Sequence, residues 1–303
     1  MKKIIINVLL LFAGFSMYSQ QDAQYTQYMY NTININPAYA GSRDVLSIFG
    51  LHRTQWVGID GAPESNTFSI SSPLGNSGLG GGLSFINDKI GPTNENKISA
   101  DMSYTISTSD TYKLSFGIKA SANLFNFDAN KLNIYNPSDA NLQNVSNDFT
   151  PNIGAGVFLH SDNTYLGLSV PNFLKTTKYS NNDRAVYLDE MHFYLIGGHV
   201  FDLSSEIKFK PSFLLKATQG APLQLDLSGN FLFNEKFTLG VAWRWNAAVS
   251  AMAGFQISPG LFVGYGYDLE TTNLENYNSG SHEIFLRYEI FKNNEKVITP
   301  RFF

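Results

Sequence analysis

The most constraining feature of the sequence is an alternation of apolar and polar residues with a period of two. From Tyr112 to Leu124 every second residue is apolar, whereas Lys113, Ser115 and the alternate residues after them are polar or small. Because successive side chains of a β-strand point to opposite faces, such a segment has one face suited to an apolar environment and one suited to water. The pattern therefore predicts a chain built from β-strands.

The same alternation recurs along the chain, with Leu214 and Phe285 as exceptions on otherwise polar faces. Short segments rich in Ser, Asn, Asp, Pro and Gly separate the runs, which indicates antiparallel hairpins. Longer connections are expected at about 53–63, 128–151 and 173–188. The sequence does not decide on which side of a membrane each of them would lie. We count about 14 strands, at 43–52, 64–73, 78–89, 94–108, 111–127, 152–161, 163–172, 189–202, 205–217, 221–233, 236–246, 248–257, 260–269 and 281–292.

The first twenty residues have the features of a secretory signal peptide. Lys2 and Lys3 precede an apolar run over 4–15, and residues 16–20 turn polar. The run is shorter than the roughly 20 residues that a membrane-spanning helix needs, and no later stretch reaches that length. If the protein is integral to a membrane, it must then be a closed barrel. We expect a cleaved signal peptide over 1–20, an N-terminal segment over 21–42 that plugs the lumen or docks on a rim, and a barrel over 43–303.

Composition favours a membrane barrel over an exported β-sandwich, which would hide its apolar faces against a second sheet. Charged residues make up 15% of the chain, against about 25% in soluble domains. Aromatic residues recur near the strand ends, as interfacial girdles require. The predicted fold class is therefore all-β, an antiparallel transmembrane β-barrel of about 14 strands in a bacterial outer membrane.

The sequence offers little for catalysis or metal binding. The chain has no cysteine, and its five histidines lack the spacing of metal ligands. The glycine-rich run over 78–82 is not followed by the Lys-Ser or Lys-Thr of a phosphate loop, so we interpret it as easing strand curvature or close backbone approach. We expect no enzyme activity, cofactor or metal. The net charge of -4, without a basic stripe, also gives a nucleic-acid partner little support.

Seven cationic side chains are predicted to face the lumen, because they lie on the polar faces of the strands. They could line an open channel or form ion pairs with a plug, and the sequence leaves both possibilities open. The seven are Lys113, Lys119, Lys208, Lys210, Lys216, Arg244 and Arg287.

Several strings of residues are more specific than composition. The run Gln27-Tyr28-Met29-Tyr30-Asn31, followed by Ile35-Asn36-Pro37-Ala38-Tyr39-Ala40-Gly41-Ser42, resembles the N-terminal motif of the PorP/SprF family of Bacteroidetes type IX secretion and gliding-motility membrane proteins. Residues 52–58 with 61–63 resemble the first loop of that family, and 264–268 with 280–284 resemble its last hairpin. Residues 78–82, 88–91 and the tail 300–303 also match, whereas about 128–190 matches least.

The resemblance implies a non-catalytic outer-membrane barrel that works with a type IX secretion machine, either as a component of it or as the helper of one large surface adhesin. We favour the helper, and our hypothesis is that it helps secrete or retain the adhesin by binding the adhesin's C-terminal domain through a rim or through residues 20–42. The implied partners are type IX secretion components, the adhesin and outer-membrane lipid. As candidate partner-binding residues we select Tyr28, Tyr30, Asn36, Pro37, Tyr39 and Trp56. The alternative is an outer-membrane channel for small hydrophobic or anionic molecules, in which inward cations would select anions.

Overall fold

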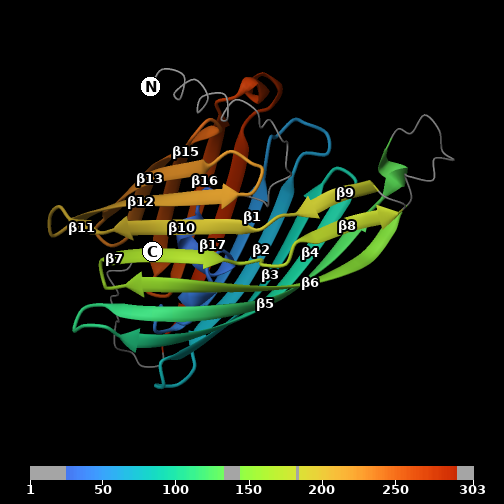
Figure 1. Cartoon of the computed structure of the whole chain (residues 1–303). Coiled ribbons are helices and arrows are strands. Elements are labelled where there is room, and N and C mark those ends of the chain that lie inside the picture. Colours follow the sequence, from blue (N-terminus) through green and yellow to red (C-terminus); the bar gives the residue numbers. More distant parts are fainter. Residues whose placement is uncertain (1–24, 133–143, 182–183, 292–303) are drawn as a thin grey trace, which may run out of the picture.

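The computed structural model describes residues 25–132, 144–181 and 184–291, and its strands form one closed antiparallel sheet (Figure 1). The ring closes where β1 pairs with β17, and β10 pairs with both β7 and β12. The predicted barrel of 14 strands is confirmed. Its strands are β1 Leu46–Thr54, β2 Glu64–Pro73, β3 Leu79–Ile90, β4 Thr93–Ser107, β5 Lys113–Phe127, β6 Val145–His160, β7 Thr164–Val170, β10 His192–His199, β12 Ile207–Thr218, β13 Gln224–Phe233, β14 Phe237–Arg244, β15 Ala248–Ser258, β16 Leu261–Glu270 and β17 Ser281–Ile290.

Three further strands lie outside this count. The two-residue β11 (Phe201–Asp202) continues β10 and also pairs with β12. The strands β8 (Thr176–Asn181) and β9 (Arg184–Asp189) form a separate hairpin, which projects from the barrel in Figure 1. The connection expected at about 173–188 is therefore not an irregular loop, since it contains paired strands.

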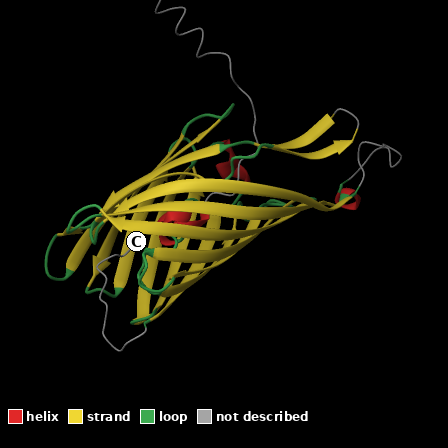
Figure 2. Ribbon diagram, turned by 60° about the horizontal axis from the view of Figure 1, so that its bottom comes forward, coloured by secondary structure: helices red, strands yellow, loops and turns green. Residues whose placement is uncertain are grey.

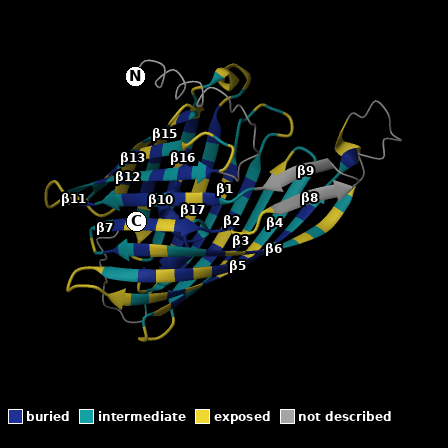
Figure 3. Ribbon diagram, in the orientation of Figure 1, coloured by how far each residue is buried: buried dark blue, intermediate teal, exposed yellow. Residues whose placement is uncertain are grey.

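The alternating residues of each strand divide between the two faces of the wall as the sequence predicts. On β5, Phe116 and Ile118 are 47% and 64% exposed on the outside, whereas Ser115 and Lys119 are buried inside. The strands consequently show alternating burial along their length (Figure 3). A closed sheet with this arrangement presents apolar side chains to lipid and polar side chains to the lumen.

Two predicted boundaries were wrong. β1 runs from Leu46 to Thr54, so Arg53 lies in a strand and not in the connection expected at about 53–63. β6 begins at Val145 because β5 is fifteen residues long and keeps pairing as far as Phe127. The loop expected at 128–151 is shortened accordingly.

The longest connections all lie at one end of the barrel, which also carries the short turns 91–92, 219–223 and 245–247. Residues 55–63, 128–144, 171–191 and 271–280 join strands at one end of the barrel, which we call the loop end. Residues 74–78, 108–112, 161–163, 234–236 and 259–260 join strands at the other end, which we call the turn end. β1 starts and β17 finishes at the turn end, since Leu46 pairs with Ile290.

The helical elements are short 3-10 turns, some of which lie inside the barrel (Figure 2). They are η1 Tyr28–Tyr30, η2 Thr32–Asn34, η3 Pro37–Tyr39, η4 Ala129–Lys131 and η5 Asn273–Tyr277. Within the described residues, no helix has the length and apolarity needed to cross a membrane. The expected signal peptide over 1–20 and the tail 300–303 lie outside the described residues.

Candidate functional site: the plugged lumen

Residues 25–43, which we call the plug segment, run through the lumen from the loop end to the turn end. Thr26 lies at the loop end, where its amide donates to Glu283 (2.8 Å) and its hydroxyl to Asp268 (2.7 Å). Arg43 lies at the turn end, where it pairs with Glu289 near the end of β17. Most of the residues between them are buried, so the segment fills the interior rather than covering a rim.

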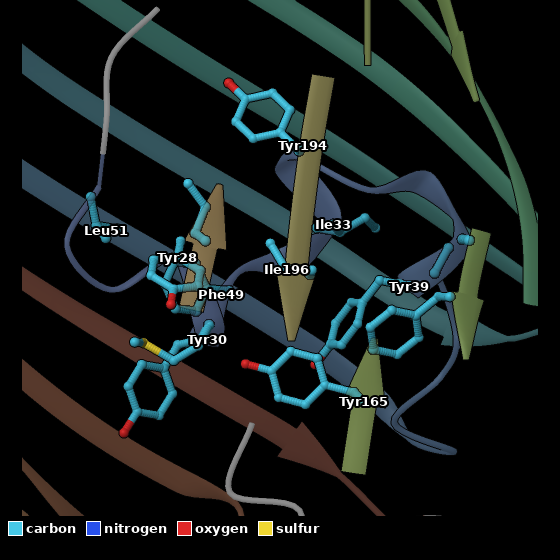
Figure 4. Close-up of a cluster of buried hydrophobic side chains, with 14 of the residues drawn as sticks. Tyr28, Tyr30, Ile33, Tyr39, Phe49, Leu51, Tyr165, Tyr194 and Ile196 are labelled. Atoms are coloured by element: carbon cyan, nitrogen blue, oxygen red, sulfur yellow. The ribbon is translucent and has the colours of Figure 1, made fainter. Parts of the chain in front are cut away.

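Aromatic and aliphatic side chains hold the middle of the plug segment against the wall (Figure 4). The Tyr30 ring lies 4.8 Å from that of Phe285 and 5.6 Å from that of Phe262, centroid to centroid. Further along, Tyr39 meets Phe158 edge to face at 5.4 Å. Such ring pairs stabilise by about 0.5–1.5 kcal/mol beyond their buried area. The inner face of the wall is therefore apolar where it meets these rings.

Two inward cations face the Tyr30 ring. Lys210 Nζ lies 5.0 Å from the ring centroid, and the Arg287 guanidinium carbon lies 5.8 Å from it. Both distances are in the range of a cation–π interaction. These two cations thus contact a plug aromatic inside the lumen.

Wall glycines allow the plug backbone to approach the sheet closely. A Cβ atom on Gly117 would lie 2.2 Å from the Ala38 nitrogen, and one on Gly80 would lie 2.2 Å from the Ala40 oxygen. Real Cβ atoms do not approach backbone this closely, so any side chain at either position would displace the segment. Gly80 belongs to the glycine-rich run over 78–82, and the contact explains that run as a seat for the plug backbone.

Short 3-10 turns leave many backbone carbonyls without a partner in the segment, and wall side chains donate to several of them. Lys119 Nζ donates to the Ile33 carbonyl (3.2 Å), and the Ser103 hydroxyl donates to the Ala40 carbonyl (2.6 Å). The Ser169 hydroxyl likewise donates to the Ile35 carbonyl (2.7 Å). These hydrogen bonds fix the path of the segment as well as its depth.

Asn36 is the most specific link between the plug segment and the wall. Its side-chain oxygen accepts from the Ala38 amide (3.0 Å) and caps η3, in which Pro37 occupies the first turn. Its side-chain nitrogen donates to the Val157 carbonyl on β6 (3.0 Å). One fully buried amide therefore shapes the turn and attaches it to the barrel.

A buried charge cluster fixes the loop end of the plug segment. Arg53 lies 2.7 Å from a carboxylate oxygen of Asp268 and 2.5 Å from one of Glu283, and all three side chains are nearly inaccessible to solvent. Thr26 completes the cluster by donating to both carboxylates. Sequence reasoning missed this cluster because it placed Arg53 in a loop. The alternation of β1 beyond His52 was the signal that could have found it.

The seven predicted lumen cations do not form a free cationic lining in the structure. Lys119 pairs with Asp101 (3.1 Å) and Arg244 with Asp226 (3.0 Å) inside the barrel. Lys113 and Lys208 instead lie near the turn end, partly exposed, beside Asp44 (3.7 Å) and Asp202 (3.2 Å). Of the remaining three, Lys210 and Arg287 both lie over the ring of Tyr30, and Lys216 lies over the ring of Tyr194.

The candidate partner-binding residues fall into two groups. Tyr28, Tyr30, Asn36, Pro37 and Tyr39 are buried in the plug segment and contact the wall, so a partner would reach them only after the segment moved. Trp56 lies apart, in the loop after β1, where its indole nitrogen donates to Glu270 (3.1 Å). Over the described part of the chain, His, Asp and Glu side chains do not gather into a metal-binding group.

A closed barrel with an apolar outer face, filled by its own N-terminal segment, defines a plugged outer-membrane β-barrel. The model of the family described as type IX secretion system membrane protein PorP/SprF matches residues 17–288. The chain belongs to this family, as the resemblance of its motifs implies, and membership implies work with type IX secretion components.

Comparison of folds finds similar solved barrels of low sequence identity. The CymD monoaromatic hydrocarbon channel is 12% identical, with a TM-score of 0.49 over 88% of this chain and 93% of that one. A Pseudomonas aeruginosa FadL homologue is 13% identical, with a TM-score of 0.47 over 93% of this chain and 97% of that one. No curated protein matches the chain.

Proposed function

We propose that this protein is a non-catalytic component of the type IX secretion and gliding-motility system that helps secrete or retain one surface adhesin by binding the adhesin's C-terminal domain. The observation that carries the proposal is the plug segment, which fills the lumen and is attached to the wall by stacking, hydrogen bonds and ion pairs. A lumen occupied in this way favours a binding role for the barrel's ends over passage through its centre.

The loop end is the surface that we assign to the adhesin. Outer-membrane barrels have short periplasmic turns and longer extracellular loops, so we place the loop end at the cell surface. There η5 presents Tyr277, which is 74% exposed, beside Leu274. Exposed aromatic residues among polar neighbours are typical of protein interfaces.

The surface around η5 is held in place by the loop that follows β1. The Val57 amide donates to the Gly280 carbonyl (2.9 Å), and the Ser279 amide donates back to Val57 (2.8 Å). Trp56 adds its hydrogen bond to Glu270 at the end of β16. In this proposal Trp56 positions the binding surface, which keeps it among the partner-binding candidates, whereas the plug tyrosines act inside the barrel.

The test uses the native bacterium, with antibody labelling of the adhesin on intact cells. Deleting the gene should abolish surface display of one adhesin. The double substitution Leu274→Ser with Tyr277→Ser should reduce that display strongly. The control is Leu203→Ser, which removes an exposed apolar side chain at the turn end and should leave display unchanged. Normal display after gene deletion would contradict the proposal.

The channel hypothesis makes the opposite prediction in planar bilayers. With the plug segment in place, the purified protein should not conduct ions persistently. A steady open pore would favour the channel for small hydrophobic or anionic molecules.

The proposal also includes removal of the signal peptide on export, so the intact mass of the mature protein should correspond to a chain that begins near residue 20.

A further inference from the structure

The outer wall of the barrel is hollowed beside the seam where β1 pairs with β17. A groove of about 470 Å³ lies over Gly50, which is the middle residue of β1. The cross-strand neighbours of Gly50 are Phe68 on β2 and Leu286 on β17, whose side chains stand on either side of it. Phe85, the cross-strand partner of Phe68 on β3, and Ile284, the next outward residue on β17, complete the lining. Two rows of large apolar side chains thus flank a position that has no side chain.

The groove is open space and not a gap filled by neighbouring atoms. A Cβ atom on Gly50 would meet no other atom within 4 Å, unlike the glycines that seat the plug segment. Its volume is in the range of about 300–1,000 Å³ that small-molecule sites occupy. The backbone at Gly50 does not have a positive φ, so conformation alone does not require glycine there.

The groove has polar side chains at the edge nearer the loop end. His52 Nδ1 lies 2.8 Å from the side-chain oxygen of Asn66, and His52 Nε2 lies 3.1 Å from the Thr54 hydroxyl. His52 and Asn66 are cross-strand partners that face outward, each two positions nearer the loop end than Gly50 and Phe68. The site is therefore apolar along its length and polar at one end, which is the pattern of an acyl chain below a lipid headgroup.

We propose that this groove binds one acyl chain of an outer-leaflet membrane lipid, with the headgroup beside His52 and Asn66. The groove lies on the face that the membrane covers, where the surrounding medium consists of acyl chains and not of water. Because an acyl chain leaves hydrocarbon to enter the groove, the gain comes from closer packing, and each additional pair of carbon atoms in contact contributes about 0.1–0.2 kcal/mol. A chain held between Phe68 and Leu286 would exchange more slowly than the lipid around the rest of the wall.

The test uses the mature full-length protein in phosphatidylethanolamine vesicles that contain a trace of phosphatidylethanolamine with a photoactivatable diazirine on one acyl chain. After illumination, mass spectrometry locates the labelled residues. Phe68 and Leu286 should carry about tenfold more label than Val241, an exposed apolar residue on β14, as a difference of about 1.4 kcal/mol gives. Equal labelling of Val241 and the groove would overturn the proposal.

Two variants and a second membrane sharpen the result. Gly50→Leu fills the groove without a backbone clash and should abolish the excess label, whereas Ala251→Leu adds a similar side chain on the outer face of β15 and should not. The wild-type labelling map decides the question even if Gly50→Leu fails to fold. In native outer membranes the groove should be labelled equally well. Shielding there, with labelling in vesicles, would mean that a membrane protein occupies the groove and would overturn the lipid assignment.

Discussion

Arg53 is the residue on which the charge balance inside the lumen depends most. One guanidinium lies within ion-pair distance of two buried carboxylates, Asp268 and Glu283, and Thr26 donates hydrogen bonds to both. Removing one partner from a buried ion pair leaves an uncompensated charge in a medium that solvates it poorly. The cost of losing Arg53 should therefore far exceed the cost of losing an exposed cation.

Replacing Arg53 by methionine should lower the free energy of unfolding by about 3–5 kcal/mol, because Asp268 and Glu283 lose their cation while buried. The control is Lys113→Met, whose ion pair with Asp44 is about half exposed and should contribute less than about 1 kcal/mol. Urea unfolding of the two variants in lipid vesicles measures both. Similar losses for the two variants would show that the buried cluster is not a special source of stability.

The contact between Gly117 and the plug backbone gives a second test at single residues. Gly117→Ala places a Cβ atom against the Ala38 nitrogen and should cost about 1–3 kcal/mol of stability through overpacking. Gly50→Ala, also in a strand, meets open space and should change the free energy of unfolding by less than about 0.5 kcal/mol. A loss at Gly117 no larger than at Gly50 would show that the segment can yield to the added methyl group.

Alternation predicted the outward faces of residues such as Phe116 and Ile118, because lipid imposes the same requirement on every strand. The exceptions Leu214 and Phe285 could not be explained from the strands alone. Both are buried on the inner face, in the cluster around the plug segment, so their cause lies in residues far away in the sequence. An apolar residue on a polar face was therefore a sign of a contact inside the lumen, not an error of register.

Among the secondary-structure elements, β2, β3 and β4 show where the apolar outer face ends. The side-chain nitrogen of Asn87 donates to the side-chain oxygens of Asn94 (2.7 Å) and Asn96 (2.9 Å), all on the outward face near the loop end. Two residues nearer the turn end on the same faces are Phe85 and Ile98, both exposed and apolar. The change from phenylalanine to asparagine on β3 should mark the membrane boundary.

Cysteine labelling tests this boundary without interference, because the chain has no cysteine. Asn87→Cys should react with a water-soluble maleimide in intact vesicles, whereas Phe85→Cys should be protected by lipid until detergent is added. Reaction of both positions at the same rate would place the boundary nearer the turn end than Phe85.

The ends of the strands were harder to predict than their number. The start of β6 was missed because Val145–Pro151 is rich in polar residues, a composition that the sequence shares with loops. These residues are strand because β5 is long enough to pair with them, and a partner's length is not visible within the segment itself.

For the whole molecule, the question is whether the plug segment stays in the lumen while the protein works. The Ser69 hydroxyl donates to the side-chain oxygen of Asn31 (2.9 Å), so these two side chains face each other, and we place cysteines at both positions to fix the segment to β2 by a disulfide, whose formation is checked by mass spectrometry. If the adhesin binds at the loop end, the oxidised Asn31→Cys, Ser69→Cys variant should display the adhesin as well as the wild type does. Loss of display on oxidation, restored by reduction and absent from either single variant, would instead show that the segment must leave.

The sequence could predict a barrel of the correct size and a special N-terminal segment, but it left plug and rim as alternatives. Deciding between them depends on side chains from many strands, such as Ser103, Lys119 and Ser169, which meet the segment only after the sheet has closed. The surface that we propose for the adhesin rests on Tyr277 and Leu274, and the sequence indicated only that these two residues belong to a connection between strands.

The path of the plug segment also constrains how the protein is assembled. The segment ends where β1 begins, and β1 is the strand on which β17 closes the ring. A segment inserted after closure would have to thread lengthwise past buried tyrosines and a charge cluster. We therefore expect residues 25–43 to be in position before β17 docks on β1, so that closure of the sheet encloses the plug segment.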